Sequence, residues 1–162
     1  MEKKEYDKDC LFCNFVSGNI KTPGIFWEDD EFMAFLTIFP NTEGVTVVIP
    51  KKHLSSDVLS LADDYLQKFI VAAKKVAKIL TDKFDDVGRV GLVMEGTGIN
   101  HAHIKLYPMH GTEFLKDGNW KAVESSNNTT PFFETYPGYI SSVDGDIVND
   151  EIIRKLANKL KS

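Results

Sequence analysis

The sequence predicts an α+β fold in which an antiparallel sheet of about five strands has helices on its faces. A short helical segment is followed by three strand-like runs, one long amphipathic helix and two further strand-like runs. Because neighbouring runs are joined by short links, antiparallel pairing is favoured over long parallel crossovers. The length of 162 residues and the 43% hydrophobic content suit a single domain with a substantial core.

The N-terminal region is predicted to hold a flexible charged segment, residues 1–9, and then a short amphipathic helix. Apolar residues recur at helical spacing between Cys10 and Ile20, before a glycine and a proline near Thr22. Cys10 and Cys13 are the only two cysteines and form the motif C-L-F-C. Their spacing fits metal ligands, plain buried cysteines or a redox pair, whereas a disulfide is disfavoured in a reducing compartment.

The next three apolar runs are predicted to be strands. Residues 24–28 (G-I-F-W-E) and 31–36 (E-F-M-A-F-L) flank the turn signal Asp29-Asp30 and predict a hairpin. Residues 45–50 (V-T-V-V-I-P) predict a third strand that stops at its proline. These runs supply three of the expected five strands.

A helix of about twenty residues is predicted after the third strand, because apolar residues recur at helical spacing from Tyr65 to Leu80. Ser60-Leu-Ala-Asp63 resembles a capping box at its start. Residues 90–95 (V-G-L-V-M-E) and 101–107 (H-A-H-I-K-L-Y) then predict two more strands.

The last predicted strand carries the residues best suited to chemistry. Side chains alternate between the faces of a strand, so His101, His103 and Lys105 are expected on one face. The intervening apolar residues, which can pack on the long helix, are Ala102, Ile104 and Leu106. Two imidazoles and an ammonium beside a glycine turn suit a phosphate, and an imidazole can attack phosphorus. The pattern also fits two structural histidines or two metal ligands.

The C-terminal part, residues 111–162, is predicted to be an extension packed on the domain formed by residues 10–110. It ends in a helix over residues 147–161, preceded by an irregular segment rich in aromatic residues. Those residues are Trp120, Phe132, Phe133, Tyr136 and Tyr139. A partner-docking role is the alternative to packing on the same chain. His110, beyond Pro108, is expected in a loop and is given no role.

The charge and hydropathy of the chain exclude some classes of partner. A net charge of −5 gives no general attraction to nucleic acid or to an anionic membrane. We find no apolar run of membrane-spanning length and no secretory signal in the N-terminal residues. We therefore expect a cytoplasmic protein that binds neither nucleic acid nor membrane.

Taken together, these segments resemble the histidine triad (HIT) family, in which three histidines alternate with hydrophobic residues. D-C-L-F-C-N-F-V-S-G-N-I is similar to the N-terminal segment of the family, and W-E-D-D-E-F through V-I-P-K-K-H is similar to its hairpin and third strand. The resemblance covers residues 9–110. It implies a nucleotide-binding fold, a homodimer with a continuous sheet, and hydrolysis or transfer at the α-phosphorus through a nucleotidyl-histidine intermediate.

The resemblance also implies roles for the histidine row. His103 stands in the place of the nucleophile, and His101 in the place of a histidine that helps to orient the site. Lys105 replaces the third histidine. A lysine keeps a positive charge for phosphate but ordinarily holds its proton too tightly to act as an acid near neutral pH. The alternative is a nucleotide-binding or regulatory module with weak or no catalysis.

The implied ligand is a purine nucleotide or a nucleotide conjugate, such as a dinucleoside polyphosphate or a phosphoramidate. Thr37 stands where the family usually has a ribose-binding aspartate, while Val45 and Met94 replace a histidine and an asparagine. The remaining positions that match the nucleotide site are Leu11, Phe12, Phe15, Phe35, Ile38, Gly96, Thr97 and Gly98. Plain core packing is the alternative for the apolar ones.

Some family members carry a structural zinc ion, and this chain matches their ligands at Cys10, Cys13, His53 and His101. Two cysteines and two histidines form a sound tetrahedral set for zinc. Zinc there would tie the N-terminal helix to the sheet and would make His101 more structural than catalytic.

Overall fold

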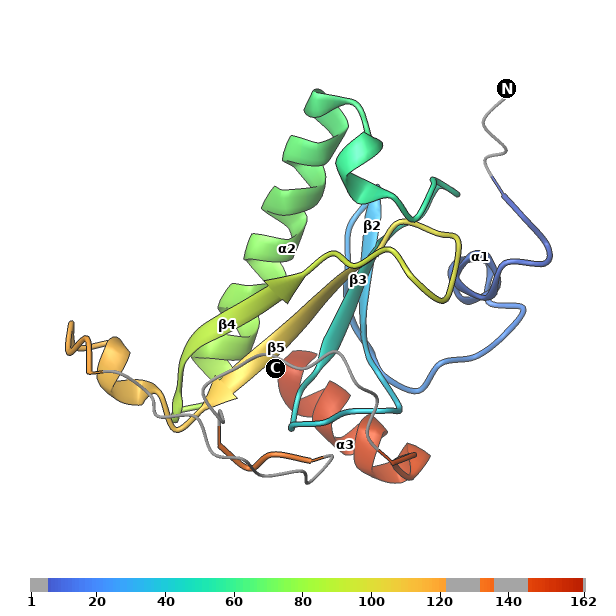
Figure 1. The fold of residues 1–162 in the computed structure, drawn as a ribbon. Helices are drawn as coiled ribbons and strands as arrows, with labels where there is room; N and C mark the ends of the chain where they lie inside the picture. Colours follow the sequence, from blue (N-terminus) through green and yellow to red (C-terminus); the bar gives the residue numbers. More distant parts are fainter. Residues whose placement is uncertain (1–5, 122–131, 136–145, 162) are drawn as a thin grey trace.

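The computed structural model describes residues 6–121, 132–135 and 146–161, and it has the predicted α+β fold (Figure 1). Five strands form one antiparallel sheet in the order β1-β2-β3-β5-β4. Their bounds are β1 Ile25–Glu28, β2 Phe32–Leu36, β3 Thr46–Pro50, β4 Val87–Val93 and β5 Ile104–His110. The prediction of an antiparallel sheet of about five strands is therefore confirmed.

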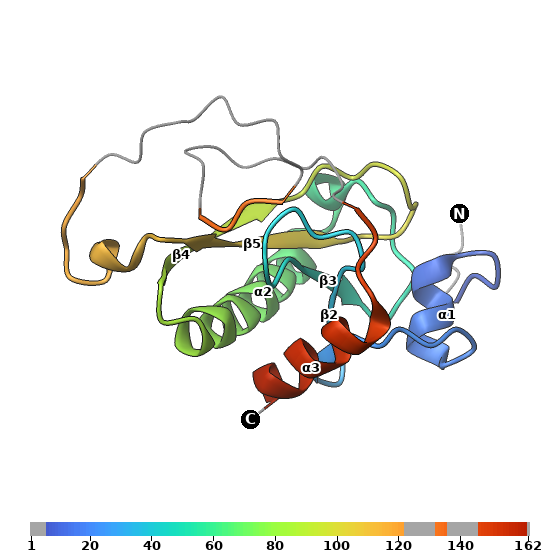
Figure 2. The ribbon, with the colours of Figure 1, turned by 90° about the horizontal axis from the view of Figure 1, so that it is seen from below.

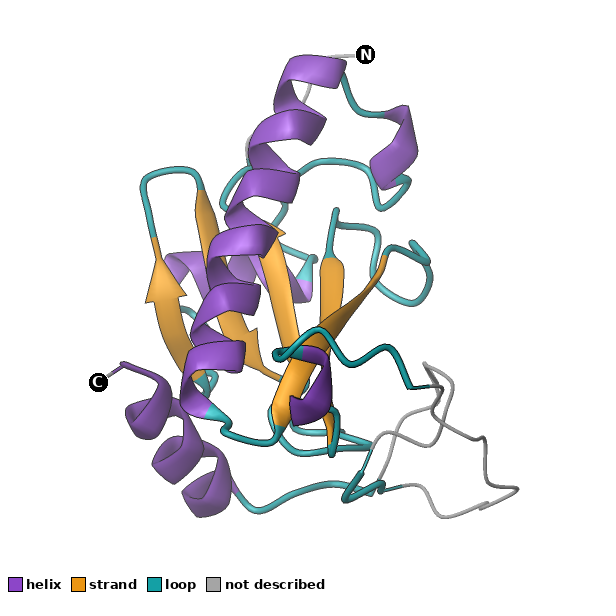
Figure 3. Ribbon diagram, turned by 90° about the vertical axis from the view of Figure 1, so that its left-hand side faces the viewer, coloured by secondary structure: helices purple, strands orange, loops and turns teal. Residues whose placement is uncertain are grey.

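Three α-helices cover the sheet: α1 Leu11–Ser17, α2 Asp63–Lys83 and α3 Asp150–Lys161. Helices α2 and α3 lie on the same face, as Figures 2 and 3 show, and share one core with it. The residues of β2 and β3 that point away from this core form a second, smaller cluster with α1. The two faces thus have separate apolar contacts, and α1 is the only one of these helices in the second cluster.

The core under α2 follows from the two periodicities of the sequence. Helix α2 buries an apolar residue at every third or fourth position, and β5 contributes Ile104 and Leu106 to the same core. The rings of Phe32 and Phe69 stack there with their centroids 5.3 Å apart. The opposite side of β5 is left free of this core and carries Lys105.

The predicted capping box at the start of α2 is wrong. The helix begins at Asp63 with Ala62 at the N-cap, and no side chain caps it. Ser60 belongs to the short 3-10 helix Val58–Ser60, and its hydroxyl donates to the Asp57 carbonyl at 2.8 Å. The hydroxyl therefore forms its hydrogen bond within the preceding turn and does not cap α2. The start of α2 is stabilised instead by the acidic residues of its first turn, whose negative charges interact favourably with the positive end of the helix dipole.

The boundaries of the last strand and the place of His110 also differ from the prediction. Strand β5 begins at Ile104 and passes Pro108, with a register irregularity in the opposing part of β4. His110 is the last residue of β5 and is buried, not in a loop. Its ring nitrogens lie 3.1 Å from the Asp86 carboxylate and 3.0 Å from the Glu43 carbonyl, so it links two loops.

The C-terminal helix α3 packs on the main core through Ile153, Ala157 and Leu160. It begins three residues later than the helix predicted from residue 147. Phe133 lies beside Thr42, whose hydroxyl donates to its carbonyl at 2.6 Å, and Trp120 is exposed. Tyr136 and Tyr139 lie outside the described residues. No helix in the described part of the chain is long and apolar enough to span a membrane.

The docking of α3 gives a first prediction, on stability. Ile153 is 3% exposed in the core and its neighbour Ile152 is 58% exposed. Ile153→Ala should lower the free energy of unfolding by about 2–4 kcal/mol, because it leaves a cavity against the sheet. Ile152→Ala, the matched control, should change it by less than about 0.5 kcal/mol. Urea unfolding measures both; equal losses would contradict this packing.

Candidate functional site

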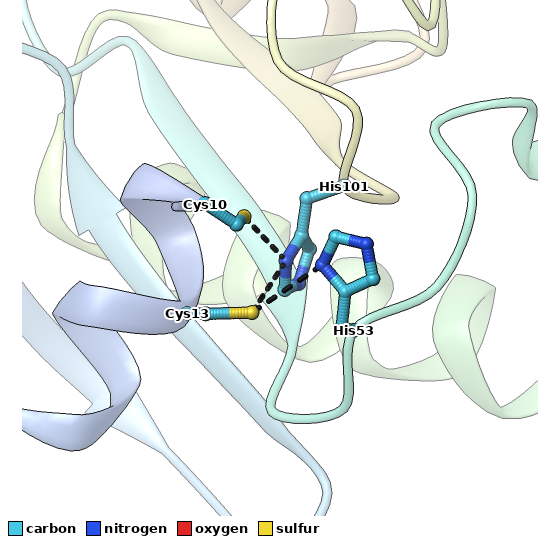
Figure 4. Close-up of side chains that lie close together, drawn as sticks. All are labelled: Cys10, Cys13, His53 and His101. Atoms are coloured by element: carbon cyan, nitrogen blue, oxygen red, sulfur yellow. Dashed lines mark hydrogen bonds between the residues drawn. The ribbon is translucent and has the colours of Figure 1, made fainter. Parts of the chain in front are cut away.

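Two cysteines and two histidines from distant segments meet at one end of the sheet (Figure 4). Cys10 and Cys13 come from the start of α1, His53 from the segment after β3, and His101 from the segment before β5. The potential ligand atoms of the four residues all lie within 4.8 Å of one another. The cluster therefore joins α1 to two segments of the sheet.

The distances within this cluster fit a tetrahedral metal ion. Cys10 Sγ lies 3.4 Å from His101 Nδ1, and Cys13 Sγ lies 3.3 Å from His53 Nδ1 and 3.6 Å from His101 Nδ1. Zinc bonds of about 2.3 Å to sulfur and 2.0–2.1 Å to nitrogen give sulfur–nitrogen separations of about 3.6 Å in a tetrahedron. Both the residue types and their spacing thus suit zinc.

The ring of His101 is oriented by the backbone of β3. Its Nε2 lies 2.9 Å from the Pro50 carbonyl, which can only accept a hydrogen bond. Nε2 must therefore carry the proton, and the lone pair of Nδ1 faces the two sulfur atoms. Burial lowers the pKa of His101 to about 4, although the bond to Pro50 acts in the opposite direction. The ring is thus neutral, as a metal ligand must be.

Burial has the opposite effect on the neighbouring thiol, since it disfavours the charged form of each group. It raises the pKa of Cys13 to about 11. Without a bound cation, Cys13 is therefore a protonated thiol at neutral pH, and a metal ion would have to displace that proton.

His103 lies directly beside this cluster and is buried. Its Nδ1 is 2.8 Å from the backbone carbonyl of His101, so Nδ1 donates and Nε2 keeps its lone pair. No described residue forms a hydrogen bond with Nε2. The His101 carbonyl thereby fixes the tautomer in which Nε2 can act as a nucleophile.

Three of the five predicted base-binding residues come together next to His103. The ring centroids of Phe12, Phe15 and Phe35 lie 5.3–6.0 Å apart, and those of Phe12 and His103 lie 5.7 Å apart with the two rings nearly perpendicular. Of the other two, Leu11 is next to Phe12 on α1 and is 39% exposed, and Ile38 packs against the main core.

Lys105 and Thr37 share a small recess on the α1 side of the sheet, which we call the Lys105 recess. Its lining residues are Thr37, Phe39, Asn41, Val45, Val47, Lys105 and Tyr107. The Thr37 hydroxyl accepts a hydrogen bond from the Phe39 amide at 3.1 Å. Thr37 also lines a larger groove of about 390 Å³ beside α3, which includes none of the four histidines.

The predicted glycine turn follows β4. Gly96 and Gly98 have φ of 66° and 84°, which favour glycine, and a Cβ at Gly96 would lie 2.7 Å from the Ser56 carbonyl oxygen. Thr97 lies between them and is exposed. The turn is thus pressed against the segment that follows His53.

Sequence reasoning missed Glu95, which immediately precedes this turn and forms an ion pair with Lys105. The available signal was a carboxylate at the end of the strand predicted to run next to the histidine row. The pairing itself depends on the register that sets Val93 opposite Lys105, and the sequence does not show that register.

Comparison with known proteins adds independent information. Residues 20–112 match the HIT domain family. An uncharacterized HIT-like protein of Methanocaldococcus jannaschii is 34% identical over 121 residues, which cover 71% of this chain and 92% of that protein. An adenosine 5′-monophosphoramidase of Candida albicans is 29% identical over 109 residues, 61% of this chain and 69% of that protein.

The solved structures show the same fold. A crystal structure of a HIT-like protein from Bartonella henselae superimposes with a TM-score of 0.65 and covers 96% of this chain and 97% of that one. The two sequences are 23% identical, so this likeness supports the fold alone.

Proposed function

The chain belongs to the HIT family, which includes nucleotide-binding hydrolases, and we propose that it is a nucleotide hydrolase or nucleotidyl transferase acting at the α-phosphorus. The observation that carries the proposal is the hydrogen bond from His103 Nδ1 to the His101 carbonyl. It leaves Nε2 as an unprotonated nitrogen beside an aromatic cluster and a lysine. That combination suits attack on the phosphorus of a bound nucleotide.

In the proposed reaction, His103 Nε2 attacks the α-phosphorus and forms a phosphorus–nitrogen bond while the bond to the leaving group breaks. The ring then carries a positive charge, and the Nδ1 proton stays hydrogen-bonded to the His101 carbonyl. In a second step water attacks the nucleotidyl-histidine, the phosphorus–nitrogen bond breaks with its electron pair returning to Nε2, and the proton lost by the water passes to solvent as the nucleotide product ionises. Lys105 supplies positive charge near the phosphate oxygens throughout.

The ligand that fits these residues best is a purine nucleotide or a nucleotide conjugate. Phe12, Phe15 and Phe35 offer apolar ring surfaces for the base. Thr37 offers a single hydroxyl where a carboxylate would grip both ribose hydroxyls, so we expect weaker ribose binding. The backbone amides of the turn Gly96, Thr97 and Gly98 are suited to phosphate oxygens.

We further propose that Cys10, Cys13, His53 and His101 hold a structural zinc ion. The short sulfur–nitrogen distances and the orientation of His101 by Pro50 support this. Bound zinc would supply a crosslink between α1 and the sheet, and the two thiolates would balance its charge. His101 would then be held through its ring, and its carbonyl would in turn hold His103.

A cytoplasmic homodimer remains part of the proposal. In the proposed dimer one sheet would continue across two copies, which requires each copy to pair through an outer strand. The outer strands of this sheet are β1 and β4.

A binding module with weak or no catalysis is the second candidate. It is favoured by Lys105, which stands where an acid would protonate the leaving group. Trapping of an adenylyl adduct on His103 by mass spectrometry supports the enzyme; tight nucleotide binding without adduct or turnover supports the module.

The nucleophile prediction is that His103→Asn lowers turnover of nucleotide conjugates by at least about 10³-fold, because the covalent route is lost. The thermal midpoint should shift by only a few degrees, since asparagine can donate a hydrogen bond to the same carbonyl. Steady-state kinetics and thermal unfolding measure the two effects. Undiminished turnover would rule out this mechanism.

The zinc prediction is that protein purified without chelator contains close to one zinc ion per chain by elemental analysis. The double change Cys10→Ser and Cys13→Ser should abolish this zinc and lower the thermal midpoint. His110→Asn, which changes a buried histidine outside the cluster, should retain the metal. Zinc below about 0.2 equivalents in the unaltered protein would contradict the proposed site.

A further inference from the structure

Lys105 and Glu95 form an ion pair that is more enclosed than the other lysine–carboxylate pairs in the described residues. Their side chains are 22% and 20% exposed, compared with 57% and 44% for Lys68 and Glu31. Lys105 lies within β5, and Glu95 lies just after β4, where the glycine turn begins. The pair therefore joins the histidine row to the turn.

This pairing limits what Lys105 can do chemically. If Lys105 gave its proton to a departing group, the Glu95 carboxylate would be left without its partner in a partly buried position. Leaving one member of an enclosed ion pair unpaired is costly. The pair thus holds the Lys105 ammonium in place as a charged hydrogen-bond donor, with Glu95 offsetting part of its charge, and a lysine ordinarily keeps its proton near neutral pH.

The described residues nearby offer no other good proton donor. The Lys105 recess contains no carboxyl or imidazole group, and a phenol such as that of Tyr107, which also lines it, ordinarily holds its proton about as tightly as a lysine. Both ring nitrogens of His101 are engaged, one with the Pro50 carbonyl and the other facing the sulfur atoms. His103 Nδ1 donates to a carbonyl on the side away from the attacking nitrogen.

Leaving groups differ in their need for such a donor. When the bond from the α-phosphorus to a bridging oxygen breaks, the electron pair leaves with a nucleoside phosphate, which is stable as an anion at neutral pH. When a bond to an amine nitrogen breaks, that nitrogen must gain a proton from an acid as it departs. An ammonium that keeps its proton can stabilise the departing anion in the first reaction by hydrogen bonding, but it supplies no proton for the second.

We propose that the Glu95–Lys105 pair makes the site selective for nucleotide conjugates whose leaving group departs as an anion, with Glu95 as a positioning residue. This inference rests on the proposed function. It assigns the chain to substrates with a phosphate leaving group rather than to phosphoramidates, the substrate class named for the Candida albicans relative.

The test compares two probes on the full chain: diadenosine triphosphate, which releases a nucleoside diphosphate, and adenosine 5′-phosphoramidate, which releases ammonia. We expect kcat/KM for diadenosine triphosphate to exceed that for the phosphoramidate by at least about 10²-fold, the usual contribution of a general acid. Lys105→His, which restores an acid with a lower proton affinity, should narrow this ratio by about 10-fold or more.

Glu95→Gln tests the positioning role. It should lower kcat for diadenosine triphosphate by about 10-fold and narrow the ratio of the two kcat/KM values, because Lys105 loses the carboxylate that holds it in place beside the departing anion. A purely structural loss would lower activity on both probes equally and leave the ratio unchanged. Glu31→Gln, which breaks the exposed pair with Lys68, is the matched control and should change neither value.

The outcomes separate this inference from the proposed function. Equal turnover of both probes through an adenylyl-His103 adduct, or an unchanged ratio in Lys105→His, overturns the selectivity and leaves the enzyme proposal standing. Absence of adduct and turnover with either probe overturns both.

Discussion

The hydrogen bonds of His101 are the constraint on which the rest of the candidate site depends. Its side chain donates to Pro50 at the end of β3, and its backbone carbonyl accepts from His103. The same residue thus sets the direction of the lone pair that faces Cys10 and Cys13 and the tautomer of the neighbouring imidazole. Because one backbone position controls both, a shift at the cysteine–histidine cluster would be transmitted directly to His103.

Most of the fold could be predicted because its periodicities agree with its packing. The alternating row of β5 and the helical spacing of α2 both point to the same core, and the structure has that core. The errors fall where local chemistry competes. The Ser60 hydroxyl is used in an earlier turn, and β5 continues past Pro108 because β4 changes register there. Neither the hydrogen bond of Ser60 nor the register change of β4 can be recognised from a single stretch of sequence.

The candidate site was predictable to a different extent. The cysteine–histidine cluster and the histidine row followed from a resemblance that matched residue types at fixed spacings. The role of Glu95 could not be predicted in this way, because a carboxylate near the end of a strand can be assigned a role only once its partner on the next strand is known, here Lys105. Leu11 and Ile38 match the same site by position, and their roles stay a prediction, because Leu11 is partly exposed on α1 and Ile38 packs against the main core. Resemblance transfers positions, whereas contacts depend on how this particular chain packs.

Helix α1 links the cysteine–histidine cluster to the proposed base-binding surface. It has seven residues and no side-chain cap, and an isolated helix of that length is unstable in water. Its attachment therefore depends on tertiary contacts, namely the packing of Phe12 and the cluster formed by Cys10 and Cys13. Phe12 is also the ring that touches His103. Whatever holds the two cysteines thus also holds one wall of the space beside His103, the proposed nucleophile. A metal ion there would shape the proposed nucleotide site without contacting the nucleotide.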